Sequence, residues 1–373
     1  MSAINRGQPL HANQIKAESG WNTLAETTSN LSHSLTVKLS DQYESRYLMR
    51  EIRVATAQFE NRDNDPDYNL SRIRELTRTA VEQGAEIVSF HEGCIPGYTW
   101  VQPLSYQQLA DVAEPVPDGP SVQKLIKIAQ EFSTVVMAGL FEIEPDGRVY
   151  NCYVTVGPDG FITKFRKLHP FVNPHLTPGE GYNVIDLLGC KVGFLICYDN
   201  NLPENVRLTT MLGAEIIIMP HVTCGLPSPM PGRGKIDRQL WENRHRDPVR
   251  IRQEFNGPKG REWLMKWLPA RAWENGVYSV FSNPVGWDYD TVKPGLSMIL
   301  DPFGEVLVET NSLEDSVVVG LLTPDKLELS SGHRYIKARR PELYDKLVEP
   351  QESITLPGWT MEHEKKDGSE ATE

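Results

Sequence analysis

The sequence predicts an α/β fold in which two mixed β-sheets pack face to face and helices cover their outer sides. Short apolar, β-branched runs alternate with amphipathic segments of helical period, which is typical of β and α units that follow one another. Two strong turn signals, Gly-Pro-Asp-Gly at 157–160 and Asp-Pro-Phe-Gly at 301–304, interrupt this alternation. Each indicates a β-hairpin, so antiparallel strands must share the sheets with parallel ones.

Regular structure is expected to begin with a strand at 51–59 and a helix at 66–82. Asp65 can serve as the N-cap of this helix, Pro66 suits its first position, and Gly84 ends it. The following elements, in chain order, are a strand at 86–90, a helix at 121–132, a strand at 133–142 and a hairpin of 149–156 with 161–167.

In the second half, a buried strand starts near Lys191 and stops abruptly at Cys197, and a helix begins around Pro203. The elements expected after this helix are strands at 214–219 and 277–283, a hairpin of 296–300 with 305–309, and a strand at 316–322 that closes a sheet.

The chain divides by composition into three parts. Residues 1–49 are polar with weak periodicity, and we interpret them as an N-terminal extension, either an arm packed on the body or a flexible tail. Residues 50–345 form the main domain, with an insertion at about 225–270 that is rich in Pro, Gly, Arg and Trp. We expect one or two short helices there and a role as a lid or an interface. Residues 346–373 form a polar, acidic C-terminal tail.

Charge and composition exclude several classes of protein. A net charge of -12 argues against nucleic acid or an anionic membrane surface as a partner. No apolar run approaches the roughly 18 residues of a membrane span, and the N-terminus lacks the apolar core of a signal peptide, so a cytoplasmic location is expected. The five scattered cysteines predict neither a disulfide framework nor a metal site, and no glycine-rich nucleotide motif supports a cofactor.

The chemistry is expected to centre on Cys197. A thiol at a strand-to-helix junction lies on a sharp turn near backbone N–H groups, which favour the thiolate and can hold an oxyanion. A lone buried cysteine is more often structural, just as Glu92 alone could be a loop carboxylate and Lys167 a solvated hairpin residue. However, all three follow or flank strand-like runs, so one rim of the sheets could bring them together.

A cysteine, a glutamate and a lysine suit attack on a carbon–nitrogen bond. The thiol of Cys197 would be the nucleophile, and Glu92 would take its proton and return one to the departing nitrogen. The ammonium of Lys167 and the backbone N–H of Tyr198 would stabilise the negative oxygen of the tetrahedral intermediate.

These residues lie in segments that resemble the nitrilase superfamily of carbon–nitrogen hydrolases. The resemblance covers about residues 51–345, and its motifs are 89–98 (SFHEGCIPGY), 164–169 (KFRKLH), 193–204 (GFLICYDNNLPE), 270–283 (beginning ARAWENGVY) and 340–344 (RPELY). It implies an α-β-β-α sandwich that dimerises. It also implies that Glu92 is the general base, Lys167 the oxyanion stabiliser and Cys197 the nucleophile.

The sequence departs from the family pattern at one place. Many members of the family that this chain resembles have a second glutamate before a Pro-Gly-like turn. Here no acid precedes Pro178-Gly179. His175 stands about where the glutamate would be, and Glu180 follows the turn. We interpret His175 as the replacement, with Glu180 or the loss of the role as alternatives.

Together these observations predict a hydrolase that acts on a small linear amide or N-carbamoyl compound through a covalent intermediate on Cys197. The sequence Cys197-Tyr198-Asp199 resembles that of the amidase and carbamoyl-hydrolase branches more than that of strict nitrilases, which have Cys-Trp-Glu at this point. Nitrile hydrolysis is one alternative, and a catalytically silent binding or assembly protein of the same fold is the other. The expected partners are a small-molecule substrate and further copies of the chain, in a homodimer or a larger oligomer.

Overall fold

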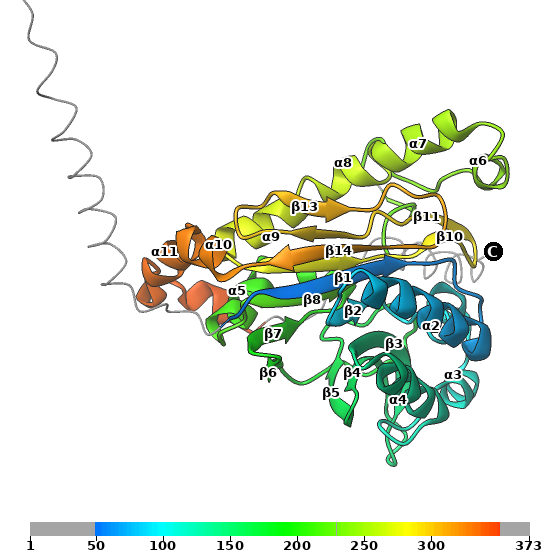
Figure 1. Cartoon of the computed structure of the whole chain (residues 1–373), viewed down its shortest axis with the longest axis horizontal. Coiled ribbons are helices and arrows are strands. Elements are labelled where there is room, and N and C mark those ends of the chain that lie inside the picture. The colour runs from blue at the N-terminus through cyan, green and yellow to red at the C-terminus, as the bar shows by residue number, and fades with distance from the viewer. Residues whose placement is uncertain (1–48, 229, 351–373) are drawn as a thin grey trace, which may run out of the picture. The chain divides into compact units, whose positions relative to one another are not determined.

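The computed structural model of the chain describes residues 49–228 and 230–350 (Figure 1). The N-terminal extension expected at 1–49 and most of the tail expected at 346–373 therefore lie outside the described residues. Within the described part, the expected α/β fold of two mixed sheets flanked by helices is confirmed.

The first sheet is mixed, with six strands. Their order is β14 (Ser316–Leu322), β1 (Ile52–Gln58), β2 (Ile87–Ser89), β3 (Val135–Ile143), β4 (Val149–Gly157) and β5 (Gly160–Arg166). β1, β2 and β3 are parallel, whereas β14, β4 and β5 pair antiparallel with their neighbours. The expected strand at 316–322 therefore closes the first sheet by pairing with β1.

The second sheet repeats this plan. Its order is β13 (Val306–Glu309), β12 (Met298–Leu300), β9 (Tyr278–Ser282), β8 (Ile216–Pro220), β7 (Cys190–Phe194) and β6 (Val184–Leu187). β7, β8 and β9 are parallel, and the outer strands pair antiparallel. A separate antiparallel ribbon, β10 (Val285–Asp288) with β11 (Thr291–Pro294), was not expected from the sequence.

Strand β1 shows why the sheets form layers. Successive side chains of a strand point to opposite faces. Ile52 and Val54 join the large apolar core that also holds the strands of the second sheet. Ala55 and Ala57 face the other way, into the core beneath helices α2 (Pro66–Glu82) and α4 (Pro120–Phe132). The alternation therefore separates an inter-sheet core from a core beneath the helices (Figure 1).

The helix signals at the start of the main domain are confirmed in detail. The Asp65 carboxylate accepts a hydrogen bond from the N–H of Tyr68, and Pro66 occupies the first position of α2. Gly84 follows the helix with a φ of 85°, in the left-handed region where glycine is favoured.

Helices also cover the second sheet. α5 (Pro203–Met211) packs near β7, and α9 (Leu268–Asn275) packs near β9. The other helical elements are α3 (Tyr106–Val112), α10 (Pro324–Leu329), α11 (Gly332–Lys337), and the 3-10 helices η1 (Thr99–Val101), η2 (Cys197–Asn201), η3 (Pro341–Leu343) and η4 (Asp345–Val348).

The segment 225–270 holds more helix than expected. It contains α6 (Arg238–Glu242), α7 (Pro248–Asn256), α8 (Arg261–Leu264) and the start of α9, so the prediction of one or two short helices was wrong. A small apolar cluster holds these helices in place, because their residues Trp241 and Phe255 pack against Val285 and Val292 of the β10–β11 ribbon. In the described part of the chain, no helix is long and apolar enough to cross a membrane.

Candidate active site

The strand directions bring three distant residues to one edge. Glu92 comes shortly after β2, Lys167 directly after β5, and Cys197 shortly after β7. β5 runs in the same direction as β2, because two antiparallel pairings separate it from β3, which is parallel to β2. Residues that follow such strands meet at the carboxyl edge of the sheets, where ligands of α/β proteins commonly bind. We refer to Glu92, Lys167 and Cys197 as the candidate triad.

Glu92 and Lys167 form a fully buried ion pair. The Nζ atom of Lys167 lies 2.6 Å from Oε1 of Glu92, and both side chains are 0% exposed. Asn151 of β4 donates a second hydrogen bond of 2.7 Å to the same oxygen, and Tyr98 OH lies 3.3 Å from the lysine Nζ. These contacts fix one oxygen of the carboxylate and the position of the ammonium.

The other carboxylate oxygen, Oε2 of Glu92, has no hydrogen-bond partner within residues 49–228 and 230–350. A buried acceptor without a donor is costly, so its presence here indicates a group kept ready for a proton. It provides the candidate triad with a base, and the Cys197 thiol is a hydrogen-bonding neighbour of the same carboxylate.

The charges of Glu92 and Lys167 both affect the pKa of the Cys197 thiol. Burial raises the pKa of its thiol above the ordinary value, and the negative charge of Glu92 raises it further. The Lys167 ammonium and a hydrogen bond from the backbone N–H of Val222 act in the opposite direction. The thiol therefore keeps its proton at neutral pH, and nucleophilic attack requires a base to remove it.

The ammonium of Lys167 is held in its charged form. Burial alone would lower the pKa of this lysine, but the negative charges of Glu92 and Asp199 raise it above its ordinary value. A buried cation with a raised pKa can stabilise a developing oxyanion without losing its proton.

The nucleophile lies on a strained turn that Asp199 holds in place. Cys197 has a φ of 49°, in the left-handed region that residues other than glycine rarely adopt. The buried Asp199 carboxylate accepts hydrogen bonds from the backbone N–H groups of Ile196, Leu168 and His169, and from the His169 ring. Asp199 therefore ties the Cys197 turn to the residues after Lys167.

The end of this turn is fixed by Arg271 of α9. Its guanidinium donates to the backbone carbonyls of Asn200 and Asn201, and it also pairs with Glu274. These contacts give Arg271 a structural role in holding the backbone that follows the nucleophile.

The Glu92 segment is fixed by close packing against β3. The Tyr153 hydroxyl donates to the carbonyl of Phe90 at 2.6 Å. Gly139 leaves no room for a side chain, because a Cβ there would lie 2.2 Å from the backbone nitrogen of Gly93. The residue after the candidate base is thus pressed directly against the sheet.

The other residues expected at the site lie apart from these contacts or at its margin. Tyr198 is half-buried, and its ring packs edge-on against Phe171, over whose ring the Lys167 ammonium lies. His175 is exposed and contacts Tyr106, and Glu180 is exposed and pairs with Arg148.

Sequence reasoning missed three residues that hold the site. Asp199 lay within a quoted motif, two positions after the cysteine, and its acidic side chain at a tight turn was a usable signal. Tyr98 likewise ended the motif at 89–98, whereas Asn151 carried no such signal because it lies inside a strand.

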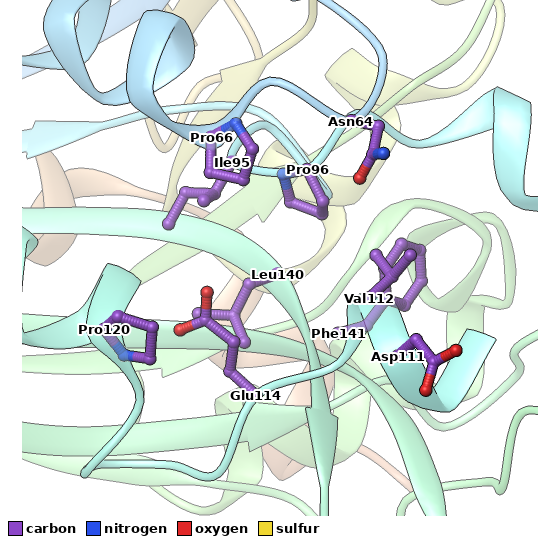
Figure 2. Close-up of a pocket in the computed structure, with 10 residues that line it drawn as sticks. All are labelled: Asn64, Pro66, Ile95, Pro96, Asp111, Val112, Glu114, Pro120, Leu140 and Phe141. Carbon is purple, nitrogen blue, oxygen red and sulfur yellow. The ribbon is translucent and has the colours of Figure 1, made fainter. Parts of the chain in front are cut away.

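A cavity of about 240 Å³ lies elsewhere, on the helix side of the first sheet. Figure 2 shows Pro66, Ile95 and Pro96 on one side of it and Leu140 and Glu114 on the other. The candidate triad is not among its lining residues, and the Glu114 carboxylate already accepts two hydrogen bonds from Ser121. Within residues 49–228 and 230–350, no group of three or more His, Cys, Asp or Glu side chains could hold a metal ion.

Comparisons with known proteins agree with this geometry. Residues 53–329 match the carbon–nitrogen hydrolase family model. An (R)-stereoselective amidase from a Pseudomonas species is 32% identical over 78% of this chain and 92% of its own. A nitrilase from Pyrococcus abyssi is 30% identical over 79% of this chain and 99% of its own.

The fold comparison points to the same group of proteins. A mutant of the amidase from Nesterenkonia sp. AN1, solved with the acetamide moiety of fluoroacetamide added covalently at the active-site cysteine, superposes with a TM-score of 0.59. The alignment covers 80% of this chain and 97% of that one at 22% identity, so the likeness concerns the fold.

Proposed function

We propose that this chain, which belongs to the carbon–nitrogen hydrolase family, hydrolyses a small linear amide or N-carbamoyl compound through a covalent intermediate on Cys197. The observation that carries the proposal is the unpaired Oε2 of Glu92 in a buried site shared with the Lys167 ammonium and the Cys197 thiol. An acceptor, a fixed positive charge and a protonated nucleophile are the parts that acyl transfer to a thiol needs.

In the acylation step, the free oxygen of Glu92 takes the thiol proton as the sulfur of Cys197 attacks the carbonyl carbon. The oxygen of the tetrahedral intermediate becomes negative, and the Lys167 ammonium and the N–H of Tyr198 stabilise it. Glu92 then gives its proton to the nitrogen as the carbon–nitrogen bond breaks. An amide loses ammonia and leaves a thioester, whereas an N-carbamoyl compound loses its amine and leaves the carbamoyl group on sulfur.

In the deacylation step, Glu92 takes a proton from water, and the resulting hydroxide attacks the carbonyl carbon of the adduct. The carbon–sulfur bond breaks, and the sulfur regains its proton from Glu92. The product is a carboxylic acid or a carbamate, and the carbamate decays to carbon dioxide and ammonia. His175, which is exposed, takes no proton in these steps, and its replacement of the second glutamate stays a prediction.

Nitrile hydrolysis is the second candidate. It is favoured by the relative from Pyrococcus abyssi, which is named a nitrilase, and it would use the same three side chains. The sequence Cys197-Tyr198-Asp199 favours the amidase reading, because strict nitrilases resemble Cys-Trp-Glu at this point.

The test is ammonia release by the wild-type protein and by Cys197→Ala across a panel of amides, N-carbamoyl compounds and nitriles. We expect turnover of at least one amide or N-carbamoyl compound and its loss in the variant. Turnover that persists in Cys197→Ala rules out the mechanism. Turnover of nitriles alone would favour the second candidate. A folded wild-type protein that hydrolyses nothing and labels at Cys197 no faster than an ordinary thiol would instead match the silent alternative.

We also propose a homodimer formed through helices α5, α9 and α11. Leu208 and Met211 of α5, Trp273 of α9 and Tyr335 of α11 are apolar and 41–47% exposed. The three helices are neighbours, and the Trp273 and Tyr335 rings are in contact. Exposed apolar patches of this kind commonly mark protein interfaces. We expect light scattering to give a dimer mass for the wild type and a monomer mass for Trp273→Asp.

A cytoplasmic location stays a prediction.

A further inference from the structure

A second buried lysine–carboxylate pair lies in the β10–β11 ribbon. Asp288 ends β10, and Lys293 lies in β11. Their residues are 1% and 0% exposed. The Nζ atom of Lys293 is 3.9 Å from Oδ2 of Asp288, which is longer than a charge-assisted hydrogen bond. The two charges therefore attract each other without direct hydrogen bonding.

Both members of this pair have hydrogen-bonding capacity that the protein leaves unused. Within residues 49–228 and 230–350, the recorded hydrogen bond of the Lys293 ammonium is a long one, 3.4 Å to the carbonyl of Cys224. Thr99 donates to Oδ2 of Asp288, whereas Oδ1 has no partner among the same residues. An ammonium has three donors, and a buried acceptor without a donor is costly. The pair thus offers both donors and an acceptor to another molecule.

Short chain segments connect this pair to the candidate triad on both sides. Thr99, which binds Asp288, follows Tyr98, whose hydroxyl is 3.3 Å from the Lys167 Nζ. Cys224, which binds Lys293, lies two residues after Val222, whose N–H donates to the Cys197 sulfur.

The same loop packs directly against the ribbon. A Cβ on Gly225 would lie 2.3 Å from the carbonyl oxygen of Val292, so β11 and the loop that carries Val222 touch backbone to backbone. The ribbon is therefore packed against the loop whose Val222 binds the Cys197 sulfur, and Cys197 is among the groups that act electrostatically on Lys293.

The charge of the pair selects the kind of group that it can bind. Asp288 and Lys293 together are neutral, and a ligand group with a net charge would leave one buried charge uncompensated. Burial and the negative charge of Asp288 raise the pKa of the nearby Asp63 carboxyl to about 7, so this group is partly protonated at neutral pH and adds less than a full negative charge. A neutral group that presents an oxygen to Lys293 and an N–H to Asp288 satisfies both partners.

We propose that Asp288 and Lys293 bind the end of the acyl group that lies away from the scissile bond, and that this end is net neutral and carries both an oxygen acceptor and an N–H donor. This inference rests on the proposed amide hydrolysis and names its substrate class. Two sources share the chemistry: a second carboxamide, as in a diamide, and the zwitterionic head of an α-amino acid, as in an amino-acid ω-amide.

The experiment compares kcat/KM for amides of matched length with different ends. The probes are glutaramide (neutral amide end), L-glutamine (zwitterionic end), glutaramate (carboxylate end), 5-aminopentanamide (ammonium end) and pentanamide (apolar end). We expect the wild type to prefer glutaramide or L-glutamine over the other three by at least about 10-fold. Whichever of the two is preferred identifies the source.

The variants Lys293→Met and Asp288→Asn test the residues themselves. Each should reduce the preference for the neutral polar end over pentanamide by about 10- to 100-fold. Lys235→Met is the matched control, since Lys235 pairs with Asp290 on the exposed surface of the same ribbon. The control should keep the wild-type ratio. A wild type that prefers a singly charged or apolar end, or a ratio that survives both variants, overturns the inference.

A binding measurement separates this inference from the proposed function. Calorimetry on Cys197→Ala should show tighter binding of glutaramide or L-glutamine than of pentanamide, and the added Lys293→Met change should remove the difference. If the wild type hydrolyses no amide but this binding pattern appears, the proposed reaction fails and the subsite stands. Equal binding of all five probes by Cys197→Ala contradicts the subsite whatever the turnover.

Discussion

Within residues 49–228 and 230–350, two lysine–carboxylate pairs are fully buried, and they differ in distance and in most of their contacts. Lys167 and Glu92 are 2.6 Å apart, and Asn151 adds a further hydrogen bond to the carboxylate. Lys293 and Asp288 are 3.9 Å apart, and the recorded hydrogen bond of the Lys293 ammonium is a long one, 3.4 Å to the carbonyl of Cys224. In each pair one carboxylate oxygen has no recorded partner. Both pairs join a lysine to a carboxylate, and both are fully buried. They differ in the distance between the two charges and in the hydrogen bonds around them.

The pKa values of the two lysines are shifted in opposite directions, upward at Lys167 and downward at Lys293. Burial pulls the pKa of each below its ordinary value, but nearby negative charges more than offset this effect at Lys167 and only partly offset it at Lys293. A tight pair keeps its charge for stabilising an oxyanion, whereas a loose pair remains available to a ligand. Tightness of contact thus separates a catalytic role from a binding role.

The largest expected effect comes from breaking the tight pair. Lys167→Met leaves the Glu92 carboxylate buried without its cation, which should lower the free energy of unfolding by about 3–5 kcal/mol. Loss of the oxyanion stabiliser should reduce kcat by about 100- to 1,000-fold. Urea unfolding and ammonia release measure the two effects.

The double variant Lys167→Met/Glu92→Gln serves as the control for this prediction. It should recover much of the lost stability and none of the activity, because the uncompensated charge is gone but the chemistry is not restored. The double variant also lacks the base, so stability is the quantity to compare: a double variant no more stable than Lys167→Met would contradict the ion-pair account.

A smaller effect is expected from the residue that positions the nucleophile. Asp199→Asn keeps the shape but weakens four hydrogen bonds to the Cys197 turn and the segment after Lys167. We expect kcat to fall by about 100-fold with a much smaller change in KM, because misplacement by about 1 Å has this cost. An unchanged kcat would mean that the strained turn holds itself.

The next effect is a shift of pH dependence. The negative charge of Glu92 raises the pKa of the Cys197 thiol, so Glu92→Gln should lower that pKa and move thiolate formation to lower pH. Alkylation of Cys197 by iodoacetamide, followed between about pH 6 and pH 10, should therefore accelerate at lower pH in the variant than in the wild type. An unchanged pH dependence would place Glu92 too far from the sulfur to act as its base.

The smallest effect is expected from removing the loose pair's cation. The pKa of Lys293 is lowered in the folded state, so the unfolded chain binds more protons between the folded pKa and the ordinary one, and this group's contribution to stability rises with pH. Lys293→Met lacks that penalty at neutral pH. Its stability relative to the wild type should therefore decline as the pH rises, as followed by urea unfolding. A constant difference would contradict the assignment.

Much of the fold could be predicted because local signals and long-range packing agree. The cap at Asp65, the stop at Gly84 and the turn at 157–160 all appear in the structure as expected. The β10–β11 ribbon could not be predicted. Its strands have four residues each, and they are held in place by packing against the helices of 225–270. Short strands carry too few residues for a pattern to emerge.

The site shows the same division. Glu92, Lys167 and Cys197 could be proposed because each stands near the end of a strand, where side chains from a sheet converge. Asn151 could not, because its position inside β4 looks like that of any buried polar residue. Lys293 was equally hidden, since only the packing of the ribbon against the loop after β8 reveals that it is buried beside the triad.

The most direct test of the account is to look for the acylated cysteine itself. The wild-type protein is quenched with acid during hydrolysis of a small amide, and its peptides are mapped by mass spectrometry. The account predicts a mass increase equal to the acyl group on the peptide that contains Cys197, and its absence from Cys197→Ala. Steady turnover with an unmodified Cys197, together with an adduct elsewhere or turnover in the variant, would contradict it.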